Sequence, residues 1–160
     1  MTVIFQHHDE LELNRIDYRG AVSSEELFAH ARFRTAAPHW LNYDHLNVIL
    51  ADANAADVTR EALSALRLRH DGLFRPENLL ILRRSAWVCF SASARPLLRH
   101  WLHTRDATAE RHTSVRLFDS IEEACGWLVL NVREAALVAR SEGFREVQRF
   151  HAPPTAAPER

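Results

Sequence analysis

The sequence predicts an α/β fold: an opening β-hairpin, then alternating helices and strands that build a mostly parallel sheet of four or five strands, then a long C-terminal helix. Three observations carry this prediction. The chain has 160 residues, 47% hydrophobic and 26% charged, which suits one domain with a buried core. Short apolar runs rich in β-branched residues alternate with stretches of helical periodicity. Two Ser-x-x-Glu pairs stand where helices should begin.

The chain opens with two apolar segments, residues 2–6 and 11–18, which are separated by a few polar residues. Apolar and polar residues alternate within the second segment with one slip of phase, which predicts a β-hairpin with a bulge. Ser23 and Glu26 have the spacing of a capping box, so we expect a helix that begins there and ends before Pro38.

The middle of the chain continues the alternation of strands and helices. Residues 46–51 form an apolar run that is typical of a strand buried on both faces, and residues 78–82 form another. Thr59 is placed to cap the helix between them. We expect a further helical stretch over residues 86–103, kinked or divided at Pro96.

The last strand is predicted over residues 113–118, and a second capping box, Ser120 with Glu123, opens the last helix. Helical spacing continues from there to about Phe150, so this helix is expected to be unusually long.

A heptad-spaced stripe, Leu130, Leu137 and Phe144, lies in the second half of that helix. Such a stripe needs a surface to cover it, either the protein's own domain, a protein partner or a second copy of the chain. The predicted organisation is an α/β domain over residues 1–128, a helical extension over residues 129–150 and a disordered tail over residues 151–160.

Composition excludes several classes of function. A formal net charge of −1 gives no overall field that would attract nucleic acid, and no window is apolar enough to insert into a membrane. The chain contains no Lys, which excludes a Schiff-base or phosphate-loop lysine. With no recognisable signal peptide, the expected location is cytoplasmic, where Cys89 and Cys125 would be buried, reduced thiols.

No catalytic motif is present, and we predict neither a metal nor a cofactor. His100 and His103 are spaced to face one ion on a helix, but no further ligand lies at a suitable spacing around them. The chain has no Gly-x-Ser-x-Gly elbow and no Gly-rich phosphate loop. The sequence therefore indicates a protein that is not an enzyme.

The loops that follow the buried strands are the candidate binding site, because ligands of open parallel sheets bind beyond the carboxyl ends of the strands. The adjacent arginines Arg83 and Arg84 could hold an anion or a partner's carboxylates, or could be solvated charges paired with Asp52 or Asp119. The candidate residues of these loops are Asp52, Asn54, Asp57, Thr59, Arg83, Arg84 and Trp87.

Four segments resemble small bacterial STAS-like, or SpoIIAA-like, proteins. They are residues 18–20 with 22–27, residues 47–52 and residues 115–128, the last reading Val-Arg-Leu-Phe-Asp-Ser-Ile-Glu-Glu-Ala-Cys-Gly-Trp-Leu. The resemblance implies a four- or five-stranded sheet with helices and usually no enzyme activity. In the anti-sigma-factor antagonists of this family, a Ser or Thr at the helix after the central strand is phosphorylated. Thr59 lies near that position, but the residues around it differ, so we interpret Thr59 as a helix cap.

Three functions follow in order of preference. The first is a non-enzymatic interaction or regulatory module that binds a protein partner or itself. The second is a small-ligand-binding sensory domain with an apolar pocket lined by some of Trp40, Trp87, Phe90 and Trp101. The third is an enzyme whose motif is not recognised.

Overall fold

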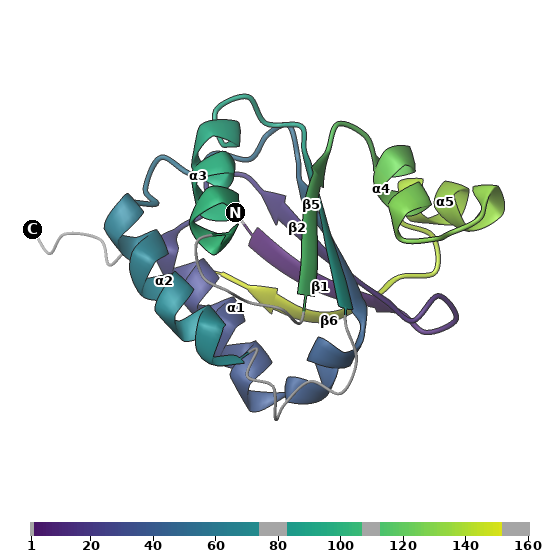
Figure 1. Ribbon diagram of the computed structural model, residues 1–160, viewed down its shortest axis with the longest axis horizontal. Coiled ribbons are helices and arrows are strands. Elements are labelled where there is room, and N and C mark those ends of the chain that lie inside the picture. The colour runs from purple at the N-terminus through teal and green to yellow at the C-terminus, as the bar shows by residue number, and fades with distance from the viewer. Residues whose placement is uncertain (1, 74–82, 107–112, 152–160) are drawn as a thin grey trace, which may run out of the picture.

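Six strands form one mixed sheet in the order β5-β4-β3-β2-β1-β6, in a computed structural model that describes residues 2–73, 83–106 and 113–151 (Figure 1). Strands β2 to β5 run parallel to one another, and β1 lies antiparallel to both β2 and β6. The strands are β1 (Thr2–His8), β2 (Leu13–Arg19), β3 (Asp44–Ile49), β4 (Arg83–Cys89), β5 (Thr113–Phe118) and β6 (Arg145–Phe150).

Helices cover both faces of this sheet. Helices α1, α2 and α3 connect the parallel strands and lie together on one face, whereas α4 and α5 lie on the other (Figure 1). Three successive crossovers of the same hand place their helices on a common face. The helices are α1 (Ser24–Ala36), a 3-10 turn η1 (Pro38–Asn42), α2 (Arg60–Leu73), α3 (Arg95–Asp106), α4 (Ile121–Trp127) and α5 (Val132–Ala139).

The α/β class is confirmed, and so are the helix starts predicted at Ser23, Thr59 and Ser120. Ser23 and Glu26 form the complete capping box of α1. Ser120 caps α4 by accepting a hydrogen bond from the Glu123 amide. The Thr59 hydroxyl accepts from the Ala62 amide at 3.1 Å, so Thr59 caps α2.

The prediction of a long C-terminal helix is wrong. Helix α4 ends at Trp127, α5 is a separate helix, and the chain then forms β6, which pairs with β1 and gives the sheet a sixth strand. Val129, Ser141 and Gly143 have φ values of 65°, 55° and 80°, and a residue in this left-handed region cannot continue an α-helix. The sheet is therefore mixed and larger than the four or five strands expected.

The helix predicted from Ala86 is also wrong, because residues 83–89 form β4. Trp87 and Cys89 belong to the core on one face of the sheet, and Ala86 and Val88 to the core on the other, which is the period of a strand. The strand expected over residues 78–82 and the disordered tail expected over residues 152–160 lie outside the described residues. Pro96 lies in the first turn of α3, where no kink results.

Two hydrophobic cores lie on opposite faces of the sheet. The core under α1 and α3 is built around Phe5, Ile16 and Cys89, and the core under α4 and α5 contains Val48 and Cys125. Both cysteines are buried free thiols, as predicted. The first core is interrupted by a cavity.

Candidate functional site

A cavity of about 140 Å³ lies between the sheet and helices α1 to α3. Tyr18 and Trp87 line it from neighbouring parts of the sheet, with ring centroids 5.8 Å apart and planes inclined by 21°. Most of its wall is aliphatic and comes from all three helices and the loops above the strands: Val22, Leu27, Ala31, Ile49, Ala53, Val58, Leu63, Leu66, Ala94, Leu97 and Leu98. The site is thus an apolar chamber with aromatic rings on the sheet side.

One end of the cavity is polar, and the register of the sheet explains which end. His45 pairs with Ser85, and Arg83 pairs with Thr113, so these four residues lie at the amino ends of β3, β4 and β5. All four line the cavity. Among the described residues that line the cavity, none is Asp or Glu. The polar end therefore carries donors and positive charge without a carboxylate from the described chain.

His30 enters this polar end from α1. Its side chain is 7% exposed and packs against Phe5 and Phe150 at ring distances of 5.9 and 5.4 Å. Burial, reinforced by the positive charge of Arg34, lowers the pKa of His30 to about 3, so the imidazole is neutral at physiological pH. Its Nε2 atom is buried and has no hydrogen-bond partner in the structure.

The neighbouring imidazoles are also neutral. Burial, then the charge of Arg34, holds the pKa of His45 well below its usual range, with smaller contributions from His30 and Arg83. The side chains of His30, Arg34, His45 and Arg83 thus all line the same cavity. The Arg34 guanidinium donates to Nε2 of His70 at 3.2 Å, which requires His70 to be neutral at that nitrogen.

Arg83 and Arg84, adjacent in sequence, lie on opposite faces of the sheet. Arg84 points to the α4 face, donates to both oxygens of Asp44 at 2.8 Å (Nη2 to Oδ2, and its amide to Oδ1), and donates to the Trp127 carbonyl at 3.0 Å. Arg83 points to the cavity, and its Nε atom is buried without a hydrogen-bond partner among the residues that the structure describes. The predicted arginine pair is thus divided by strand alternation, and only Arg83 belongs to the site.

The strand-end loops contribute the opposite end of the cavity. Asn54 lines it, and the Asn54 side chain also accepts a hydrogen bond from the Ala56 amide at 2.8 Å, which fixes the loop. A surface hollow of about 340 Å³ shares Asn54, Ala55, Val58 and Leu97 with the cavity. This hollow, between the first turns of α2 and α3, lies where a ligand would enter.

The structure brings three of the seven predicted loop residues to the cavity: Asn54, Arg83 and Trp87. Asp52, Asp57 and Thr59 are exposed and do not line it. Of the aromatic residues proposed for a pocket, Trp87 and Trp101 line it, Trp40 packs against Phe5 outside it, and Phe90 is 45% exposed.

Sequence reasoning missed the contribution of α1. Leu27, His30, Ala31 and Arg34 follow the spacing i, i+3, i+4, i+7 and all line the cavity. Two polar residues on the apolar stripe of a helix were the signal that would have identified them.

The C-terminal stripe is distributed over different elements. Leu130 and Phe144 pack against the core under α4 and α5, and Leu137 is half-buried near the end of α5. These residues therefore serve the protein's own core or lie beside it, in segments that do not form one helix face.

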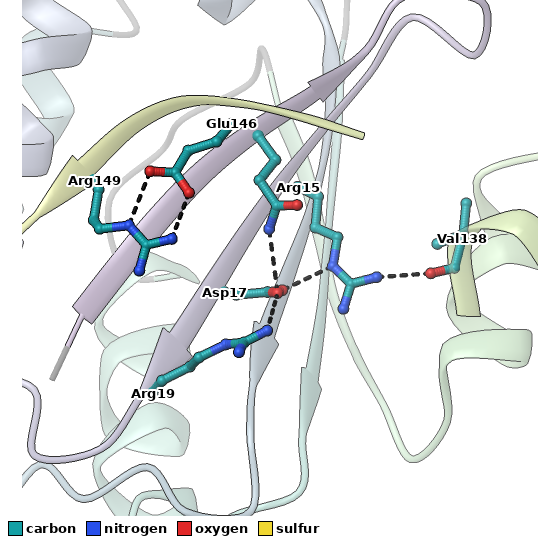
Figure 2. Close-up of polar contacts among 7 residues, drawn as sticks. Arg15, Asp17, Arg19, Val138, Glu146 and Arg149 are labelled. Carbon is teal, nitrogen blue, oxygen red and sulfur yellow. Dashed lines mark hydrogen bonds and ion pairs between the residues drawn. The ribbon is translucent and has the colours of Figure 1, made fainter. Parts of the chain in front are cut away.

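A second polar cluster lies on the opposite face of the sheet (Figure 2). The Asp17 carboxylate is fully buried and accepts hydrogen bonds from Arg15 at 2.8 Å, Gln6 at 3.2 Å and Arg19 at 3.4 Å. Arg15 also donates to the Val138 carbonyl at 2.7 Å, which ties α5 to β2. Every charge drawn there has a partner, so this cluster is a structural element.

Comparison of the chain with protein-family models, with curated proteins and with solved structures finds no match. Within the described parts of the chain, no helix has the length and apolar character needed to cross a bilayer.

Proposed function

We propose that this protein is a non-enzymatic binding module for a small amphipathic molecule, which occupies the cavity between the sheet and helices α1 to α3. The observation that carries the proposal is an apolar chamber with a polar end in which His30 and Arg83 have buried nitrogen atoms without partners. A buried donor without a partner costs roughly 1–3 kcal/mol, so a ligand that pairs with these atoms gains that stabilisation on binding.

The volume limits the size of the ligand. A cavity of about 150 Å³ lined by aliphatic and aromatic side chains takes up benzene. The cavity here, about 140 Å³, suits a molecule with one ring or an equivalent branched chain. It is too small for an acyl chain of a membrane lipid or for a dinucleotide.

Two experiments test the proposal. The mass of the full-length protein by native mass spectrometry, compared with its mass after denaturation, reveals any small molecule that co-purifies. NMR titration with a one-ring probe, toluene, tests binding in the cavity directly. Binding should shift amide resonances of residues around Tyr18 and Trp87. The Ala31→Leu variant places a larger side chain in the cavity and should abolish these shifts. The control Ala139→Leu makes the same change on an exposed position of α5 and should leave them unchanged. If toluene causes no shifts in the unmodified protein and no molecule co-purifies, the proposal fails.

Partner binding through the C-terminal region is a second candidate, and one observation favours it. Val129 and Val132, at the turn between α4 and α5, are 76% and 90% exposed. Light scattering on the full chain and on a Val129→Ser, Val132→Ser variant tests this idea, because a mass that is monomeric in both would oppose self-association. The STAS-like resemblance, with the regulatory role it implies, stays a prediction beside both candidates.

A further inference from the structure

We infer that the ligand of the cavity is an anion, a carboxylate carried on a single aromatic ring, whose charged group is received at the polar end by Arg83 and Ser85, which line the cavity from the same strand. This inference rests on the proposed function, and it adds the charge and the orientation of the ligand.

The donors at the polar end select a negative group. Arg83 supplies a guanidinium whose Nε is buried and has no hydrogen-bond partner among the described residues. The Ser85 hydroxyl accepts a hydrogen bond from Asn47 at 3.1 Å, which leaves its own proton to donate. A carboxylate accepts up to four hydrogen bonds and donates none, so it can pair with both groups, whereas an ammonium group could not pair with the Arg83 guanidinium, which only donates.

Charge leads to the same choice. Burial lowers the pKa values of His30 and His45, so both imidazoles are neutral and add no charge beside Arg83. No carboxylate from the described chain lines the cavity. A positive side chain that is partly removed from water gains from a negative partner in the same low-dielectric region.

The apolar part of the cavity specifies the body of the ligand. Tyr18 and Trp87 lie in the carboxyl-terminal halves of β2 and β4. Their stacked rings are therefore between the polar end, at the amino ends of the strands, and the loops that follow the strands. An aromatic ring packs against such a pair with an attraction beyond its buried area. The carboxylate would then point toward the amino ends of β3 and β4, and the ring toward the hollow beside Asn54 and Leu97.

The test compares benzoate with benzyl alcohol, a neutral probe of similar size, by NMR titration of the full-length protein at pH 7. We expect benzoate to bind at least about 10-fold more tightly, which is the usual contribution of a hydrogen bond to a charged group. Arg83→Met keeps the length of the side chain and removes its charge, so it should abolish this preference. Arg83→Lys keeps the charge and should retain part of it.

Arg116→Met is the matched control. Arg116 lies on the neighbouring strand β5 but is exposed on the opposite face, so the preference should persist in this variant. If the two probes bind equally, or if Arg83→Met and Arg116→Met behave alike, the inference is overturned while the proposed function stands. If neither probe shifts the resonances of cavity residues, the proposed function fails and the inference fails with it.

Discussion

Replacing Asp17 with Ala should destabilise the protein severely, because it leaves a buried arginine without its counter-charge. The Asp17 carboxylate is fully buried, and the side chain of Arg15 beside it is 4% exposed. Arg15 donates to Asp17 and to the Val138 carbonyl, so after the substitution only one of these partners remains (Figure 2). The guanidinium cannot lose its proton to escape the cost.

The expected size follows from the burial of both partners. Removing one partner of a buried ion pair costs about 3–5 kcal/mol, mostly through the unpaired charge that remains. For a chain of this length, each kcal/mol lowers the Tm by roughly 2–4 °C, so a fall of about 6–20 °C is expected. Glu146 and Arg149 form the comparison pair on the same face, with side chains 43% and 42% exposed. Glu146→Gln should cost no more than about 1 kcal/mol.

Urea unfolding followed by circular dichroism measures all of these changes. The double variant Asp17→Leu, Arg15→Met removes both charges and should recover much of the stability lost by Asp17→Ala. If the double variant is as unstable as the single one, the cost comes from lost packing and the reasoning from unpaired charge is refuted. The same conclusion follows if Asp17→Ala is as mild as Glu146→Gln.

Three further predictions concern single positions. Because the pKa of His30 is lowered to about 3, the unfolded chain binds a proton between pH 6.5 and 3 that the folded protein does not. The free energy of unfolding should therefore fall below pH 6.5 by up to about 1.4 kcal/mol per pH unit. Urea titrations at pH 5 and 7 should show a smaller difference in the His30→Gln variant. Gly143→Ala should destabilise by at least about 1–3 kcal/mol, since φ is 80° and the added Cβ would lie 2.5 Å from His8 Nε2; unchanged thermal unfolding would contradict this. Val129→Gly should raise stability by about 1 kcal/mol, because Val129 has φ 65° and is 76% exposed, and a lower Tm would show that its packing matters more than its strain.

The N-terminal half of the fold was predictable because its signals are local. The capping box of Ser23 and Glu26 and the apolar run of β3 each require only neighbouring residues to be recognised. The segment after α4 was not predicted correctly, although one local signal was present. Asn131 and Glu134 form a second complete capping box in the middle of the predicted long helix, which marks a new helix start.

Strand β6 depends on a distant partner. Its exposed side chains are charged or polar, and only Val147 and Phe150 face the core, so the segment has little strand character of its own. It becomes a strand because β1 offers an unpaired edge at the far end of the sequence. A helix assigned from heptad spacing could not reveal that edge.

The candidate site was predictable in part for the same reason. Arg83 and Trp87 were identified as binding candidates, but from loops that turned out to be a strand. His30 and Arg34 were not among the predicted site residues, although they lie on the stripe of α1 that lines the cavity. Their role becomes visible only when the amino ends of β3 and β4 are placed opposite that stripe.

The two faces of the sheet differ in how fully their buried polar atoms are paired, and this contrast supports a ligand in the cavity. On the α5 face, Asp17 has three donors, and Arg15 has both a carboxylate and a carbonyl. The chain thus supplies a complete set of partners where the role is structural. On the cavity face, His30 and Arg83 keep buried nitrogens without partners beside an apolar chamber. Unpaired buried atoms beside an apolar cavity support the proposed binding site, because a binding site must keep polar groups available for its ligand.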